Sequence, residues 1–160
     1  MLPKGLLIAL ITGVVAGPVL GYGLYSQSNH EQLQFVEGSA ISIVTEKFDF
    51  KEGEQVLIKI INSGTVPLVF SDASYGLRIT GLDGVLYYTP VAAQVISTLE
   101  PRGETTFAWD QQKVDGSDML EGMYKIVAEG LDPENNKVKR SIVINLIKKA
   151  FILRTHIHTG

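Results

Sequence analysis

The chain has 160 residues, of which 45% are apolar, 8% aromatic and 19% charged. This length fits one domain of ordinary size with an appendage. The normal apolar fraction and the net charge of only -3 exclude a disordered chain. Since the sequence contains no Cys, it excludes disulfides, a thiolate metal site, haem thiolate ligation and a Cys nucleophile.

The amino-terminal part of the chain is predicted to cross a membrane. Residues 6–25 carry no charge, and a helix of about 20 residues spans the roughly 30 Å apolar core of a bilayer. Lys4 precedes this run, and no Lys or Arg follows until Lys47. Because positive charge stays on the cytoplasmic side, we expect a single-pass cell-membrane protein with its N-terminus in the cytoplasm. Residues 1–26 would be a retained transmembrane anchor, and residues 27–37 a stalk that leads to an extracytoplasmic head.

Two other interpretations of this segment stay open. A cleaved secretory signal would place Val14 and Ala16 before the cut, although the apolar run continues beyond Ala16 to Tyr25. Separately, Lys4-Gly5-Leu6-Leu7 resembles the class III signal of archaeal prepilins. That resemblance implies cleavage after the Gly and a pilin-like filament subunit whose apolar helix packs in the filament core.

Three glycines of the anchor are four residues apart, at Gly13, Gly17 and Gly21. Residues at this spacing share one face of a helix, and glycines there let a second helix approach closely. The functional interpretation is a packing face for a partner transmembrane helix. The alternative is that glycine is common in membrane helices and that Pro18, beside Gly17, marks a kink.

Residues 38–147 are predicted to form an all-β sandwich. Short runs rich in Val, Ile, Thr and Tyr alternate with turn signals, as is typical of this fold. Gly53, Gly84, residues 101–103 and residues 132–136 supply the turns. We expect seven to nine strands, with residues 148–160 as a C-terminal tail. The expected strands cover residues 40–45, 55–61, 66–70, 77–80, 85–88, 93–97, 105–109, 123–128 and 138–147.

The apolar positions of these runs predict the core of the sandwich. A large apolar side chain contributes about 1.5–3 kcal/mol when it is buried, which suffices for a domain of about 110 residues without disulfides. The predicted core is Ile43, Val56, Ile58, Ile60, Leu68, Phe70, Leu77, Ile79, Phe107, Trp109, Tyr124, Ile126, Ile142 and Ile144.

Several motifs of the head look like those of a known family. A strand that ends in Asn is followed by an apolar strand and then by a strand led by Tyr. A Pro-x-Gly-Glu turn, a strand that carries Trp and a Gly-x-Tyr start come later in the chain. These motifs occupy residues 58–64, 67–71, 75–79, 99–104, 107–110 and 121–124. Over roughly residues 40–129 the chain resembles the intracellular proteinase inhibitor (BsuPI-like) domain.

The resemblance implies an immunoglobulin-like antiparallel sandwich and suggests proteinase inhibition, without locating an inhibitory loop. The residues that carry the resemblance mark the fold. The Pro-x-Gly-Glu turn precedes the strand with the core Trp, and the Tyr of the Gly-x-Tyr motif packs and forms hydrogen bonds at a corner of the sheet. These fold markers are Asn62, Tyr75, Pro101, Gly103, Trp109, Gly122 and Tyr124.

The sequence contains no recognisable catalytic set, and we predict neither an enzyme nor a cofactor or metal site. The histidines are His30, His156 and His158, so none lies within the predicted sandwich to complete a Ser-His-Asp triad. The His156-x-His158 pair is two ligands in a tail, which makes a weak metal site. Three carboxylates over residues 115–121 lack the spacing of a calcium loop and fit a solvated loop.

The distribution of charge points to the class of partner. Between Glu31 and Glu134 lie all 17 acidic residues, and 10 of the 14 basic residues lie between Lys47 and Arg140. The head therefore carries about -7, which argues against binding of nucleic acid. The sequence predicts an interaction or accessory subunit whose partners are other transmembrane helices or subunits of a membrane complex. A proteinase inhibitor and a pilin-like subunit are the alternatives, and the sequence leaves open whether a small molecule binds.

Overall fold

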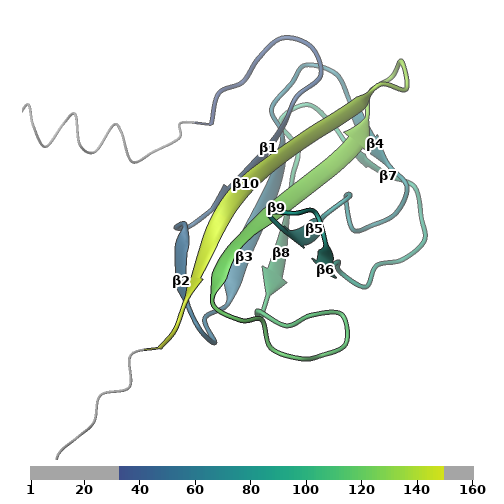
Figure 1. Cartoon of the computed structure of the whole chain (residues 1–160). Coiled ribbons are helices and arrows are strands. Elements are labelled where there is room, and N and C mark those ends of the chain that lie inside the picture. The colour runs from purple at the N-terminus through teal and green to yellow at the C-terminus, as the bar shows by residue number, and fades with distance from the viewer. Residues whose placement is uncertain (1–32, 150–160) are drawn as a thin grey trace, which may run out of the picture. The chain divides into compact units, whose positions relative to one another are not determined.

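A computed structural model describes residues 33–149, and all of its regular secondary structure is β-strand. Within these residues ten strands follow one another, and Figure 1 shows how they are arranged. The prediction of an all-β fold is therefore confirmed for this part of the chain. The strands are β1 (Ile41–Thr45), β2 (Asp49–Lys51), β3 (Val56–Asn62), β4 (Leu68–Phe70), β5 (Arg78–Gly81), β6 (Leu86–Tyr88), β7 (Ser97–Leu99), β8 (Glu104–Trp109), β9 (Gly122–Leu131) and β10 (Lys137–Ile147).

Two sheets form a β-sandwich. The smaller sheet has the order β1-β3-β8, with antiparallel neighbours. The larger sheet has the order β2-β10-β9-β4-β7, and β9 also pairs with β5, which in turn pairs with β6. Along one edge of β9, Val69 of β4 pairs with Leu131 and Arg78 of β5 pairs with Val127. Two short strands, β4 and β5, therefore share the edge of one long strand.

The core lies between the sheets and follows the alternation of the sequence. In β3, Val56, Ile58 and Ile60 are fully buried, whereas Leu57 between them is exposed. Trp109 of β8 is also fully buried. Twelve of the fourteen predicted core residues are buried, and the other two, Phe107 and Tyr124, are partly buried and pack against the core.

The chain changes sheets between β1 and β2. After pairing with β3, it crosses to the larger sheet, where β2 runs parallel to β10 and Phe50 pairs with Leu146. Phe50 is 1% exposed, so the crossing closes one side of the core.

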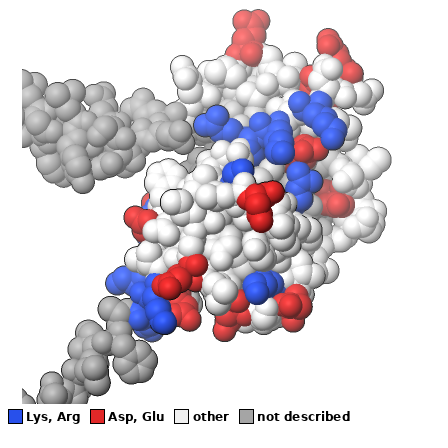
Figure 2. All heavy atoms as spheres, in the orientation of Figure 1, with Lys and Arg blue, Asp and Glu red and all other residues white. Residues whose placement is uncertain are grey.

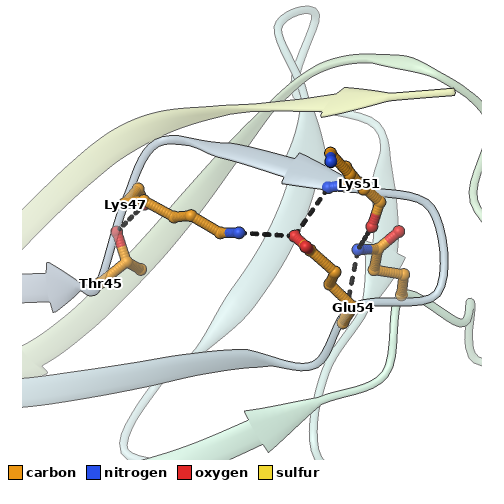
Figure 3. A network of polar contacts seen from close by, with 5 residues as sticks. Thr45, Lys47, Lys51 and Glu54 are labelled. Atoms are coloured by element: carbon orange, nitrogen blue, oxygen red, sulfur yellow. Dashed lines mark hydrogen bonds and ion pairs between the residues drawn. The ribbon is translucent and has the colours of Figure 1, made fainter. Parts of the chain in front are cut away.

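Polar contacts hold this crossing in place, and Figure 3 shows them. Thr45 Oγ1 donates to the carbonyl oxygen of Lys47 at 2.8 Å, and Lys47 Nζ lies 2.7 Å from Glu54 Oε2. The same Glu54 oxygen accepts from the backbone N–H of Lys51. The hydrogen bond from Lys47, followed by that from Lys51, lowers the pKa of Glu54. The side chain of Gln111 donates to the carbonyl oxygens of both Lys51 and Glu54, which ties this turn to the loop after β8.

Two details of the predicted strands are wrong. Residues 33–149 form ten strands instead of seven to nine, because β2 was not expected. The run expected as a strand over residues 93–97 is mostly loop, and β7 begins at Ser97. Val95 and Ile96 of this run are 56% and 78% exposed, although they are aliphatic. Composition alone therefore misplaced this strand.

Several predictions fall on residues outside the described range. The anchor over residues 1–26, its glycines Gly13, Gly17 and Gly21, most of the stalk and nearly all of the tail lie there. Across residues 33–149 there is no helix with the length and apolar character needed to cross a bilayer.

Candidate interaction surface

Three of the fold markers meet at one turn. Asn62 is fully buried at the end of β3, and its Nδ2 donates to the carbonyl oxygens of Val66 and Leu99 at 2.8 and 2.7 Å. Its backbone N–H donates to the carbonyl oxygen of Gly103, in the turn that Pro101 opens. A side chain on Gly103 would lie 2.8 Å from the carbonyl oxygen of Glu100, so only glycine fits there. These residues join the ends of three strands.

Three further markers organise the corner between β8 and β9. Trp109 is fully buried, and its Nε1 donates to the carbonyl oxygen of Gln112 at 2.8 Å. Gly122 has a φ of 146° at the start of β9. Two residues later the hydroxyl of Tyr124 donates to the carbonyl oxygen of Leu120 at 2.9 Å. Burial raises the pKa of Tyr124, and the hydroxyl therefore stays protonated as a donor.

Tyr75 packs inside the fold as well. Its φ is 53°, and its ring lies 5.1 Å from the ring of Phe70 and 6.3 Å from that of Phe107, measured between centroids. Tyr87 and Tyr88 are also partly buried against the core. The three tyrosines therefore stabilise the sandwich, in keeping with the ordinary behaviour of aromatic residues in strands.

In the acidic loop before β9, Ser117 satisfies one of the three carboxylates. Asp115 accepts from both the hydroxyl and the backbone N–H of Ser117, which lowers the pKa of the carboxyl group. No group of three His, Asp or Glu side chains within residues 33–149 is arranged to hold a metal ion. His30, His156 and His158 lie outside the described residues.

The larger sheet carries a different kind of surface on the side that faces away from the smaller sheet. In β9 the inward residues Ile126 and Ala128 alternate with Lys125, Val127 and Glu129, which point outward. Residues that pair across strands share a face, so the register of β5, β6, β9 and β10 defines this outer face. The outer face consists of Arg78, Thr80, Leu86, Met123, Lys125, Val127, Glu129, Leu131, Lys137, Lys139, Ser141, Val143 and Asn145.

Positive charge predominates on the outer face. Figure 2 shows basic side chains gathered over the upper part of the side that β9 and β10 present. One acid lies among them: Glu129 accepts from Arg78 at 3.2 Å and pairs with Lys137 at 3.4 Å. Burial raises the pKa of Glu129, but the contacts with Arg78 and Lys137 outweigh that effect and keep the pKa below its ordinary 4.5. Glu129 therefore stays ionised at neutral pH and cancels part of the positive charge.

The middle of the outer face is a shallow hollow with an apolar floor. Val127 is only 5% exposed, because the longer side chains around it cover it. The hollow has a volume of about 260 Å³, and Arg78, Lys125 and Lys139 line it together with Ser141. Lys125 Nζ donates to the carbonyl oxygen of Leu82 at 3.0 Å, which holds this ammonium group at the rim.

Aliphatic side chains border the hollow at one end. Leu86, Met123 and Val143 are 50%, 55% and 44% exposed, respectively. In rows across the strands, Thr80 pairs with Leu86 and with Lys125, and Lys125 pairs with Val143. The outer face therefore combines a basic half and an aliphatic half on one rigid sheet, an arrangement suited to contact with another molecule.

A second hollow, of about 320 Å³, lies at the carboxyl end of β10. Glu52, Gln111, Glu121 and Lys148 contribute its polar lining. Gln111 uses its amide N–H groups on the backbone of the β2–β3 turn. This hollow therefore offers less free binding chemistry than the outer face.

No protein-family model matches the chain, and no curated protein does either. Among solved structures, the sporulation control protein Spo0M from Bacillus subtilis aligns with a TM-score of 0.41 and 14% identity, over 72% of this chain and 51% of Spo0M. The alkylpurine DNA glycosylase AlkC from Pseudomonas fluorescens, bound to DNA with an abasic site analog, aligns with a TM-score of 0.37 and 12% identity, over 68% of this chain and 30% of AlkC. FlgD from Xanthomonas campestris, described in connection with hook capping in flagellar assembly, aligns with a TM-score of 0.29 and 25% identity, over 58% of this chain and 70% of FlgD. The chain thus spans about half of Spo0M and less than a third of AlkC, and these weak likenesses assign neither a family nor an activity.

Sequence reasoning did not single out the outer face. Its residues alternate with the predicted core, as Arg78 does between Leu77 and Ile79 and Lys125 does between Tyr124 and Ile126. That alternation indicates which side chains point away from the core. It does not show that strands about 45 residues apart in the chain lie side by side, which is a matter of register.

Proposed function

We propose that the protein is a membrane-anchored, extracytoplasmic β-sandwich that acts as a protein-interaction or accessory subunit of a membrane complex. The observation that carries this proposal is the outer face of the larger sheet, where half-exposed aliphatic side chains adjoin a basic hollow. The charge-free run over residues 6–25 and the glycines at Gly13, Gly17 and Gly21 support the anchor and a partner helix.

Two features of the head support an immunoglobulin-like assignment. The first strand pairs in one sheet and the next in the other, so that β1 neighbours β3 and β2 neighbours β10. The hydroxyl of Tyr124, near the start of β9, bonds back to the carbonyl of Leu120, as the corner tyrosine of such domains does. Many domains of this architecture act by presenting a surface and carry no catalytic groups.

Native mass measurement of the full chain, extracted in a mild detergent, tests the proposal. We expect a complex with a second subunit that Gly17→Leu weakens, because the larger side chain blocks close helix approach. Met123→Lys and Val143→Lys on the outer face should weaken it as well. Leu57→Lys is the matched control, since Leu57 is 47% exposed on the smaller sheet. A strictly monomeric protein would contradict the proposal.

The mass of the native polypeptide separates the alternatives for the amino terminus. A retained anchor leaves the chain uncut. A pilin-like subunit would begin at Leu6, and a secreted form would begin at Gly17. Either shortened form would overturn the anchored topology.

A proteinase inhibitor is the second candidate, and the loop between β6 and β7 favours it. Val91 and Ile96 protrude there, and a hydrogen bond from Ala73 N–H to the carbonyl oxygen of Ala93 holds the loop. A small aliphatic side chain suits the narrow specificity pocket of elastase-like proteases. Inhibition of such an enzyme that Val91→Asp abolishes would support this function, whereas no inhibition across a panel of serine proteases would exclude it.

A further inference from the structure

The charge of the outer face is opposite to that of the head as a whole. Residues 31–140 contain 10 basic and 17 acidic side chains and carry -7. Among the outward residues of β5, β6, β9 and β10, Arg78, Lys125, Lys137 and Lys139 oppose Glu129, which gives the outer face +3 and leaves -10 for the remainder. Asp49 and Lys51 of β2 lie beside these residues on the same sheet, and their charges cancel. Composition therefore does not account for the basic face. It is a local concentration of cations on an acidic domain.

The register places three of these cations in successive rows. Lys125 stands in one row, Arg78 pairs with Val127 in the next, and Lys139 pairs with Glu129 in the row after that. Rows on one face are two residues apart, which is about 7 Å along the strands. An extended peptide segment laid along the strands presents alternate side chains at the same repeat of about 7 Å.

The aliphatic half continues this pattern. Met123 occupies the row beyond Lys125. In the row of Lys125 itself, Val143 pairs with Lys125 on one side, and Thr80 on the other side pairs in turn with Leu86. Consider an extended segment whose alternate carboxylates face the three cations. The residue two positions before its first carboxylate is on the same side and would therefore lie over Met123. An aliphatic side chain is the complement of that position.

We propose that the outer face binds an extended, acidic segment of a partner protein, with carboxylates at alternate positions opposite Lys125, Arg78 and Lys139 and an aliphatic residue over Met123. This inference rests on the proposed function and adds the chemistry of the partner. Arg78 offers a planar, forked donor that matches a carboxylate, and Lys125 and Lys139 offer point charges on flexible stems.

The same cations would attract an anionic lipid surface, but the aliphatic side chains favour a protein segment. The outer face contains no Trp, Tyr or Phe, which are the side chains typical of membrane-surface anchors. Leu86, Met123 and Val143 are only about half exposed, so they fit a contact with side chains better than insertion between lipids.

Fluorescence anisotropy with a designed peptide tests the inference. The protein is the full chain in micelles of an uncharged detergent. The labelled probe peptide is Gly-Leu-Thr-Glu-Thr-Glu-Thr-Glu-Gly, and its control peptide has Gln in place of every Glu. We expect saturable binding of the Glu peptide alone. Raising ionic strength from about 0.1 M to about 1 M should weaken the binding, because the screening length falls from about 10 Å to about 3 Å.

Variants separate this contact from attraction by charge in general. Arg78→Gln combined with Lys139→Gln should weaken binding at least about fivefold, which matches two exposed charge contacts. Glu129→Gln should tighten binding about twofold, because it removes the carboxylate that competes for Arg78. Lys59→Gln combined with Lys113→Gln removes the same charge elsewhere and should leave binding unchanged. Unfolding temperature is measured for each variant to verify that the fold persists.

The contrary outcomes are distinct. Equal binding of the Gln peptide, equal weakening by both double variants, or tighter binding of phosphatidylglycerol vesicles than of the Glu peptide would overturn the inference. If the native complex forms but the acidic peptide does not bind, the partner chemistry is wrong and the proposed function stands. If the peptide binds as expected but the native protein is monomeric, the proposed accessory role fails instead.

Discussion

The Nδ2 atom of Asn62 donates to the carbonyl oxygen of Leu99 at 2.7 Å and so joins the end of β3 to the end of β7. The same nitrogen reaches the carbonyl oxygen of Val66, and Oδ1 accepts from the backbone N–H of Gly64. A single side chain therefore satisfies three backbone groups, and its contacts with Leu99 and Gly64 are buried. The two sheets meet at this point, since β3 belongs to the smaller and β7 to the larger.

Replacing this side chain should be costly. Asn62→Ala leaves backbone groups of Val66, Leu99 and Gly64 unpaired, and a buried unpaired group costs about 1–3 kcal/mol. We expect a loss of about 3 kcal/mol in the free energy of unfolding, measured by urea denaturation. Asn145→Ala is the control, because Asn145 makes one exposed contact with Asp49. Similar losses in both variants would contradict this role.

The hydroxyl of Tyr124 should stabilise the corner before β9. Tyr124→Phe keeps the packing of the ring against Tyr87 but removes the hydrogen bond to Leu120. The expected loss is about 1 kcal/mol, measured by thermal or urea unfolding. Tyr75→Phe should cost less, because the Tyr75 hydroxyl donates to no atom of residues 33–149. If Tyr75→Phe lost more stability than Tyr124→Phe, the hydrogen bond from Tyr124 would not be what stabilises this corner.

Two glycines with positive φ should respond differently to the same substitution. Gly76 has a φ of 65°, and an added Cβ would lie 2.0 Å from the carbonyl oxygen of Glu129. Gly53 has a φ of 82° with no atom within 4 Å of an added Cβ. Gly53→Ala should therefore cost about 1 kcal/mol for backbone strain alone. Gly76→Ala should cost about 3 kcal/mol, because β9 must also shift. Equal losses on urea denaturation would mean that the close approach of Gly76 to β9 is absent.

Stability should fall in acid. A hydrogen bond from the Ser74 side chain lowers the pKa of Asp72, and one from the Lys47 side chain lowers the pKa of Glu54. A carboxyl whose pKa is lower in the folded state stabilises the fold above its unfolded pKa, and that contribution disappears as pH falls through the folded pKa. The decline should therefore begin near the ordinary values of 4.5 for Glu54 and 3.8 for Asp72 and continue below them.

Urea denaturation across this acidic range measures the decline. Asp72→Asn removes the titrating carboxyl group, and Ser74→Ala removes the hydroxyl that lowers its pKa, so each should make the decline shallower. The double variant should add little to Asp72→Asn, because no carboxyl group remains for the hydroxyl to act on. A pH profile that neither variant alters would show that Asp72 contributes nothing to acid sensitivity.

The sequence predicts the core of this fold well, because apolar residues in each core strand alternate with residues that point outward. Ile58 and Ile60 alternate with outward residues, which identifies β3. The strand that ends in Trp109 begins directly after the turn at residues 101–103, which identifies β8. The strand β2 has only three residues, and one of them, Phe50, is buried. Three residues are too few to show the alternation that identifies a strand in a sequence. The place of β2 depends on pairing with β10, nearly 100 positions later in the chain. For the same reason, Arg78 and Lys125 become neighbours only through the register of β5 with β9.

The parallel pairing of β2 with β10 has a mechanical consequence. Asn145 N–H donates to the carbonyl oxygen of Phe48, and Glu52 N–H donates to that of Ile147, so the early strand lies along the final one in the same direction. Tension applied between the two ends of the described chain would pull these strands past each other lengthwise. Hydrogen bonds loaded in this way share the force and break together, whereas those of a peeled hairpin break one by one. The sheet-crossing segment therefore works as a clamp against stretching.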